Sequence, residues 1–267
     1  MNMNFDVIVI TKNRYKLLLN QIKRIKDIFP YNKIIVIDSN ENIPEDIKEY
    51  YLNENIEFYH TPNVNIGNAR QTGLKNVTTK YFFMIDDDIV FKKYVAYEMY
   101  YKMINYTNNV FALSPIILFG TNENILSIYK RKRKDVEGVS SGYCIINKDI
   151  INKIGGFNVN IHVGEDSELF YRAKKKGYNW MRLHNVFVNH PCTDMQFIFR
   201  TWNHRKGMMF SVNYGFDTYY SLILKKLRDM FLNLISFIKH RNYRTTMFLI
   251  CNDFISLITY VWGMINV

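Results

Sequence analysis

Cysteine is scarce in this chain of 267 residues, and the few that occur are poorly placed to cooperate. Cys144, Cys192 and Cys251 are odd in number, far apart and never in a Cys-x-x-Cys spacing. This pattern argues against a disulfide framework and against a zinc cluster, and it favours a reducing, cytoplasmic setting. The stretch Met1–Thr11 lacks the basic segment and the cleavage site of a secretory signal, so we expect it to belong to the mature chain.

Glycine-rich nucleotide-binding loops are missing as well. The chain contains neither Gly-x-x-x-x-Gly-Lys-Ser/Thr nor Gly-x-Gly-x-x-Gly. Their absence argues against a nucleoside triphosphatase and against a nicotinamide-dependent dehydrogenase. Internal repeats and low-complexity tracts are also absent from the sequence.

Apolar and basic residues, by contrast, are abundant. A hydrophobic fraction of 48% and an aromatic fraction of 16% provide enough apolar surface for a globular core. The net charge of +11 and the pI of 9.4 favour anionic partners, namely nucleic acid, nucleotide phosphates or an anionic membrane surface. Charge alone does not choose among these three.

Short apolar runs, typical of buried strands, alternate with helical patterns along the first 190 residues. Strands are expected at Phe5–Ile10, Lys33–Asp38, Ile56–Tyr59, Tyr81–Ile85, Val110–Leu118 and Gly142–Ile146, with another short one before His190. Helices are expected around Leu18–Phe29, from near Gly67, and over Glu165–Lys176. The order predicts an α/β fold with a Rossmann-type open mixed sheet flanked by helices, whose ligands bind beyond the carboxyl ends of the strands.

Acidic side chains follow two of these strands. Asp86-Asp87-Asp88 ends the strand at Tyr81–Ile85, and in extended backbone Asp86 and Asp88 point to the same side. The pair therefore has the spacing to share Mg²⁺ or Mn²⁺ with a diphosphate, although an acidic triplet is also a common turn element. Asp38 could hold a ribose or a base, or it could form an Asx turn with the residues after it.

Two further segments have the residue types for chemistry at a helix start. Gly67, Arg70 and Gly73 open a helix where a phosphate could lie, or they form part of an ordinary capped helix. Gly164-Glu165-Asp166 could complement a helix dipole, and Asp166 could alternatively act as a general base. His190, after a strand, is either structural or a metal ligand.

The carboxyl-terminal part differs in character. Apolar residues at Ile223, Leu227, Met230, Leu234 and Ile238 form one stripe, which lysines and an arginine oppose. The segment Met247–Val267 is apolar but carries Asn252 and Asp253 near its middle. This combination predicts an amphipathic helical extension on a membrane surface in preference to a transmembrane span.

Taken together, the motifs resemble glycosyltransferase family 2, the inverting nucleotide-sugar transferases with a GT-A fold. The resemblance covers about the first two hundred residues, through VIVITKNR, IIVIDSN, NIGNARQTGL, FFMIDDDIV, GYCIINKDIINKIGGFN and GEDSELFYRAKKKGY. One departure is Lys12, which stands where many relatives have an aromatic residue that stacks on the base.

The resemblance implies a role for each candidate residue. Nucleotide-sugar binding falls to Thr11, Asn13, Arg14, Asp38, Arg70, Asp86 and Asp87. Metal binding, of Mn²⁺ or Mg²⁺, falls to Asp86, Asp88 and His190, and Asp166 becomes the catalytic base.

The resemblance also implies an organisation and a function. Residues 1–215 would form the GT-A domain, with a nucleotide-sugar half (1–109) and an acceptor half (110–215), and residues 216–267 the membrane-associating extension. The expected enzyme transfers a sugar, from a UDP-sugar above all, to a glycan, lipid-linked or envelope acceptor on the inner face of the cell membrane. A non-catalytic sugar-nucleotide or glycan-binding module is the alternative. The basic loop Lys130–Lys134 is the only motif-like support for a nucleic acid partner, and we expect none.

Overall fold

The computed structural model describes residues 3–106, 109–119, 136–137, 141–161 and 164–191, with the single positions 223, 224, 227, 231, 254, 257 and 258. The chain divides into two compact units, of which the first comprises residues 1–118 and 129–190. The second unit comprises residues 119–128 and 191–267. The basic loop Lys130–Lys134 and the expected domain boundary at residue 215 lie outside the described residues.

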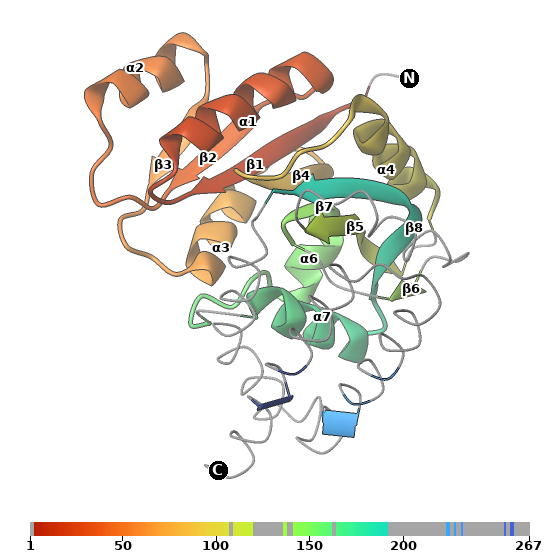
Figure 1. Ribbon diagram of the computed structural model, residues 1–267. Coiled ribbons are helices and arrows are strands. Elements are labelled where there is room, and N and C mark those ends of the chain that lie inside the picture. The colour runs from red at the N-terminus through yellow and green to blue at the C-terminus, as the bar shows by residue number, and fades with distance from the viewer. Residues whose placement is uncertain are drawn as a thin grey trace. The chain divides into compact units, whose positions relative to one another are not determined.

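Strands and helices alternate over residues 5–119, and in the later part of the first unit strands follow strands and helices follow helices (Figure 1). The strands are β1 (Phe5–Thr11), β2 (Ile34–Asp38), β3 (Glu57–His60), β4 (Tyr81–Asp86), β5 (Val110–Phe119), β6 (Val136–Glu137), β7 (Tyr143–Asn147) and β8 (Asn179–His190). The helices are α1 (Tyr15–Ile28), α2 (Glu45–Asn53), α3 (Ile66–Asn76), α4 (Lys93–Asn105), α6 (Lys148–Ile154) and α7 (Glu165–Lys175).

The strands form one mixed sheet in the order β3-β2-β1-β4-β7-β5-β8-β6. β1 pairs in parallel with β2 and β4, and β2 with β3, whereas β7 runs antiparallel to both β4 and β5. Helices cover both faces of the parallel half of the sheet, and its strands are therefore apolar throughout. The predicted open mixed sheet is confirmed.

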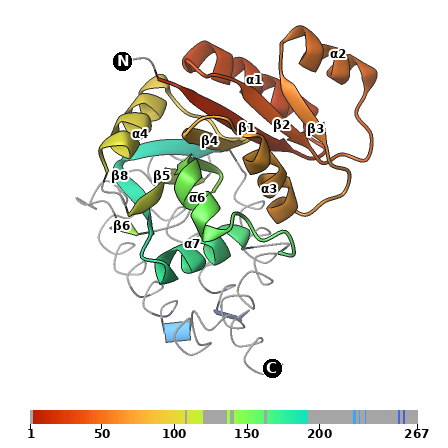
Figure 2. The ribbon, with the colours of Figure 1, turned by 180° about the vertical axis from the view of Figure 1, so that it is seen from behind.

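Two hydrophobic clusters cover the two faces of this sheet. One face packs against α1, α2 and α4 through residues such as Leu18, Tyr51 and Met99. The other packs against α3, α6 and α7 through residues such as Leu74 and Leu169. Figure 2 shows α3, α6 and α7 from behind, on the side of the sheet away from α1.

Three helices were not predicted, and one strand is longer than expected. α2 buries only Ile47 and Tyr51, and in α4 tyrosines on the outer side hide the apolar period of the buried residues. α6 is only seven residues long. β8 has twelve residues and not a short run. Among the described residues, none of the helices is both long and apolar enough to cross a membrane.

Candidate active site

The sheet register brings the predicted nucleotide-binding residues to one edge. Thr11 at the end of β1 lies opposite Asp38 of β2, and Ile10 lies opposite Asp86 of β4. Because all three strands are parallel, their carboxyl ends meet here. The residues that the sequence separates by up to 75 positions therefore share one edge.

Asp38 is fully buried and is an acceptor for the loop that follows it. Its Oδ1 accepts from the backbone N–H and the side-chain amide of Asn40, at 3.0 and 2.6 Å, and its Oδ2 accepts from the Tyr51 hydroxyl at 3.2 Å. The Asx bond expected of a turn is thus present. Burial, together with the Asp38 charge, raises the pKa of Tyr15 to about 12, so this phenol stays protonated. The backbone N–H of Asn13, a residue with φ of 60°, donates to the Asn40 side chain.

The acidic triplet does not continue the strand. The backbone turns after Asp86, and the Ile89 N–H reaches back to its carbonyl at 3.4 Å. The argument that alternation places Asp86 and Asp88 on one side therefore does not apply, because Asp87 and Asp88 lie in a turn. Gln21 of α1 supports the turn, since its amide donates to the Asp86 carbonyl at 2.9 Å.

Two arginines contact the three carboxylates, Arg14 two of them and Arg70 the third. Asp87 is buried and accepts from the Thr11 hydroxyl at 2.8 Å, while its other oxygen lies 2.8 Å from the Arg14 guanidinium. Asp88 also contacts Arg14, at 2.6 Å. Asp86 remains 28% exposed, with the Arg70 guanidinium 3.6 Å away. Asp87 consequently holds the turn in place, and Asp86 is the most open of the three.

Burial favours the neutral form of two carboxyl groups of the triplet, Asp86 and Asp87. It raises the pKa of Asp87 to about 7, even though Arg14 and the Thr11 hydroxyl act in the opposite direction. It also raises the pKa of Asp86, against the nearby Arg70. Such crowding of acids at low dielectric creates a site that a cation stabilises.

His190 ends β8 beside the triplet. The backbones of Val90 and Asn189 exchange hydrogen bonds of 2.7 and 2.8 Å, which fixes the end of β8 next to the turn. The His190 Nε2 lies 3.3 Å from Asp88 Oδ1. Within the described ranges, no three His, Cys, Asp or Glu side chains are grouped closely enough to hold a metal by themselves. An imidazole and a carboxylate at this separation can both reach one Mn²⁺ or Mg²⁺, which commonly completes its shell with phosphate oxygens.

A buried arginine connects the triplet to the start of α7. The Arg70 side chain is only 3% exposed, and one nitrogen donates to Ser141 Oγ at 2.6 Å and pairs with Glu165. Ser141 Oγ in turn donates to Asp166 Oδ2 at 2.8 Å. Arg70, expected to bind the nucleotide, is therefore engaged with three protein groups. The candidate base Asp166 belongs to the same network as Asp86.

Close packing keeps this network next to the triplet. A Cβ added to Gly142 would lie 3.0 Å from Asp86 Oδ2, so the strand β7 begins against that carboxylate. The Gly142 carbonyl also accepts from the Asp86 backbone N–H at 2.8 Å. Ser141 and Glu165 were not predicted as site residues, since their contacts with Arg70 span 71 and 95 positions. The small residues before Gly142 are the only local hint of a close approach.

Comparison with known proteins now decides the family. The family model described as Glycosyl transferase family 2 matches residues 6–161, more than half of the chain. The chain belongs to glycosyltransferase family 2. The match includes the acidic triplet and Arg70 and ends before Asp166 and His190. No curated protein is similar enough in sequence to match this glycosyltransferase.

Solved structures support the same fold. The glycosyltransferase is similar to the mannosyltransferase PcManGT from Pyrobaculum calidifontis, in complex with GDP-Man and Mn²⁺, with a TM-score of 0.61 and 13% identity over 98% of this chain and 74% of that one. It is also similar to residues 1–349 of S. aureus TarS in complex with UDP, with a TM-score of 0.56 and 17% identity over 78% and 66% of the two chains. It covers 39% of a longer TarS chain. At these identities the likeness concerns the GT-A fold.

Proposed function

We propose that this glycosyltransferase is an inverting enzyme that moves a sugar from a nucleoside diphosphate sugar, a UDP-sugar above all, to a hydroxyl group of an acceptor. The observation that carries the proposal is the chain of contacts from Asp86 through Arg70 and Ser141 to Asp166. It keeps a carboxylate for the acceptor near the carboxylates for the donor. A binding module without catalysis has no need of that pairing.

Asp166 is the proposed general base. It takes the proton from the acceptor hydroxyl while that oxygen forms a bond to the anomeric carbon of the sugar. The bond from this carbon to the diphosphate breaks on the opposite face, and its electron pair leaves with the diphosphate. Attack on one face and departure from the other invert the anomeric configuration. Ser141 holds Oδ2 of Asp166, and the Ser167 backbone N–H donates to Oδ1 at 2.7 Å.

Asp86, Asp88 and His190 are the proposed metal ligands, acting together with oxygens of the donor diphosphate because they are not grouped closely enough to hold the ion by themselves. When bound, Mn²⁺ or Mg²⁺ supplies positive charge against the negative charge that develops on the leaving diphosphate. Two arginines add positive charge at the same place, because Arg14 lies beside Asp88 and Arg70 beside Asp86. Thr11, Asn13 and Asp38 line the ends of β1 and β2 on the side assigned to the nucleoside. A neighbour of the same fold was solved with GDP-Man and Mn²⁺, which supports this arrangement.

The acceptor is proposed to be a glycan, a lipid-linked saccharide or an envelope polymer at a membrane surface. At the described helical positions of the second unit, Leu224, Leu227 and Phe231 are 49%, 46% and 63% exposed. Their spacing of three and four residues places them on one side of a helix. Exposed apolar side chains on a basic segment are typical of a helix that lies on an anionic membrane surface. We propose a peripheral position on the inner face of the cell membrane.

A donor screen with metal depletion tests the function. Purified protein is incubated with UDP-, GDP- and dTDP-sugars with Mn²⁺ or with a chelator, and release of the nucleoside diphosphate is measured. We expect metal-dependent release from a UDP-sugar, with UDP affinity reduced in Asp88→Asn. Asp166→Asn should lose transfer and keep UDP binding.

Asp149→Asn is the matched control for the base. Asp149 lies in the first turn of α6, as Asp166 does in α7, and is exposed. Asp149→Asn removes the same negative charge from a helix start but leaves the contacts of Arg70, Ser141 and Asp166 unchanged. Equal loss of turnover in both variants, or no turnover in the wild type with any donor, contradicts the proposal.

A further inference from the structure

A second candidate site lies at the opposite end of the parallel strands. A surface hollow of about 690 Å³ is formed there by three segments, which are the residues before β1, the turn after α1 and one side of α4. Its lining residues are Met3, Asn4, Pro30, Tyr31, Asn32, Tyr97 and Tyr101. β1 runs from this hollow to Thr11, and its residues rise by about 3.3 Å each, so the two ends are about 20 Å apart. The hollow is therefore separate from the acidic edge.

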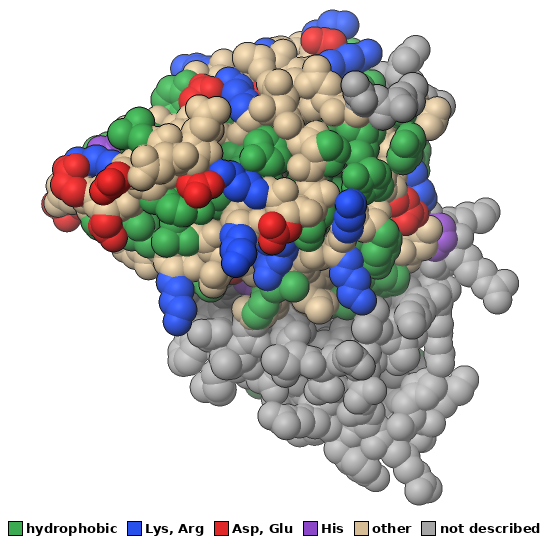
Figure 3. Space-filling view, turned by 90° about the horizontal axis from the view of Figure 1, so that it is seen from above, with side chains coloured by type: hydrophobic (Ala, Val, Ile, Leu, Met, Phe, Trp, Pro, Cys, Tyr) green, Lys and Arg blue, Asp and Glu red, His purple; other side chains and the backbone are tan. Residues whose placement is uncertain are grey.

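The lining combines aromatic rings with neutral polar groups. Three of its seven residues are tyrosines, two are asparagines, and none is charged. Tyr101 is 44% exposed, so its ring is accessible. Figure 3, which looks down on the molecule, shows acidic side chains gathered at the α2 end, and green side chains interspersed with blue ones on the α4 side. The volume falls within the range of sites for small molecules, about 300–1,000 Å³.

This lining selects among chemical classes of ligand. An acyl chain would cover the tyrosine hydroxyls and offer them no hydrogen-bond partner, which is costly. An anionic ligand would find no cation among the lining residues. The nearby Lys93 is not one of them, and its Nζ lies 5.7 Å from the ring centre of Tyr97. A neutral pyranose presents an apolar C–H face to an aromatic ring and hydroxyl groups to amides and phenols. An oligosaccharide therefore matches both parts of the surface.

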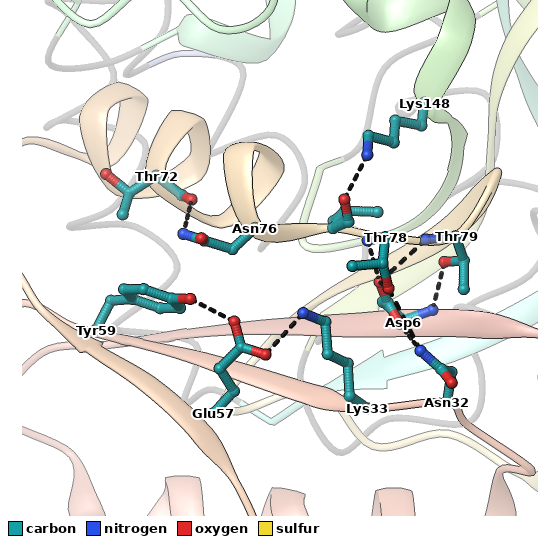
Figure 4. A network of polar contacts seen from close by, with 11 residues as sticks. Asp6, Asn32, Lys33, Glu57, Tyr59, Thr72, Asn76, Thr78, Thr79 and Lys148 are labelled. Carbon is teal, nitrogen blue, oxygen red and sulfur yellow. Dashed lines mark hydrogen bonds and ion pairs between the residues drawn. The ribbon is translucent and has the colours of Figure 1, made fainter.

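The hollow is also held in shape from beneath. The Asn32 amide donates to Asp6 Oδ1 at 2.8 Å, and Asp6 is fully buried (Figure 4). Asp6 accepts in addition from the Thr78 hydroxyl at 3.0 Å and from the Thr79 backbone N–H at 3.2 Å. Its carboxylate thereby fixes the rim of the hollow to the start of β4. A surface that is already ordered loses less entropy when a ligand binds.

We propose that this hollow binds a neutral oligosaccharide segment at a distance from the transfer site. The inference rests on the proposed function, because an enzyme that extends a glycan always has such a chain within reach. A chain bound at the hollow raises the effective concentration of its end near the acidic edge. The consequence is a preference for long acceptors over short ones.

Direct binding tests the proposal without knowledge of the acceptor. Cellohexaose, laminarihexaose and mannohexaose are each titrated into the full chain, and binding is followed by saturation-transfer NMR and calorimetry. We expect at least one hexaose to bind, with an affinity reduced at least about fivefold in Tyr97→Ala and in Tyr101→Ala. Tyr97→Phe keeps the ring and should retain most of the affinity. Tyr94→Ala is the matched control, because Tyr94 is a 49% exposed tyrosine of the same helix outside the lining.

Each other outcome has a defined meaning. Absence of binding by all three hexaoses at about 10 mM overturns the proposal. Unchanged binding in both alanine variants also overturns it, and loss of binding in Asp88→Asn assigns the sugar to the transfer site instead. UDP binding and thermal midpoints are measured on every variant to confirm folding. UDP binding and donor turnover in Tyr97→Ala report on the acidic edge alone. If UDP binding or donor turnover is absent, the proposed function fails, and the result says nothing about the hollow.

Discussion

Ser141 offers the sharpest test of how the site is assembled. Its hydroxyl links Arg70 and Asp166, because it accepts from the Arg70 guanidinium at 2.6 Å and donates to Asp166 at 2.8 Å. Ser141→Ala removes both hydrogen bonds and leaves the charges in place. We therefore expect the variant to keep the site's composition and to lose the orientation of the proposed base.

The magnitude follows from these contacts. A hydrogen bond to a charged group contributes about 1.5–3 kcal/mol. If the Ser141–Asp166 bond is needed in the transition state, its loss lowers kcat about 10- to 100-fold. Arg70 still has Glu165 and Asp86 as partners, so donor binding should change little. The expected result is a fall in kcat at nearly constant KM for the donor.

Two companion variants separate positioning from general damage. Ser141→Thr keeps the hydroxyl and should recover most of kcat. Ser114→Ala removes another fully buried serine hydroxyl, one without a hydrogen-bond partner among the described residues of the chain, and should leave kcat unchanged. Steady-state kinetics with varied donor, together with thermal midpoints, measure all three. A kcat of Ser141→Ala equal to that of the wild type refutes the reasoning, as does a lowered midpoint that Ser141→Thr fails to restore.

Two further predictions concern stability and membrane binding. Burial raises the folded-state pKa of Asp87 to about 7. The native state therefore keeps a proton that the unfolded state loses above about pH 4, and this carboxyl group lowers the free energy of unfolding as the pH rises to 7. Urea unfolding should show Asp87→Asn gaining about 3 kcal/mol relative to the wild type between pH 5 and pH 8; parallel pH curves contradict this. Leu227→Asp combined with Phe231→Asp should reduce cosedimentation with vesicles containing phosphatidylglycerol, whereas Leu52→Asp, at a 72% exposed position of α2, should not; equal binding by both variants removes the membrane proposal.

The fold could be predicted because its central strands are short apolar runs whose environment leaves little choice. β1, β2 and β4 are buried on both faces, and their sequences are correspondingly apolar. α2 escaped prediction because it buries only two of its residues, and α4 because tyrosines on its outer side hide the apolar period of its buried residues. In α4, Tyr97 and Tyr101 lie on the outer side, where they line the hollow. The same residues that obscured the helix therefore define the second candidate site.

The candidate site could be predicted only in part, for a related reason. Asp38, Asp86 and Asp88 follow strands, and parallel strands end at one edge, so local pattern and topology together bring them close. The sequence left open both extended backbone and a turn after Asp86. The turn is present, and it invalidates the argument from alternation because a single residue in turn geometry reverses the alternation of side chains. Ser141 carries only a weak local signal, the run of small residues before Gly142, and a serine before a strand is common. Its role depends on contacts across 71 and 25 positions.

Arg70 shows how much the role of a motif residue depends on its tertiary contacts. A helix start with small residues and an arginine favours a phosphate ligand. In the structure the small residues admit close packing instead, because a Cβ at Gly67 would overlap the Asn158 carbonyl oxygen. α3 is thereby pressed against the segment that leads to α7, and Arg70 meets Glu165 in the interior. A buried guanidinium between two acidic groups has few free donors for a phosphate, so its effect on the donor must pass through the carboxylates that it holds.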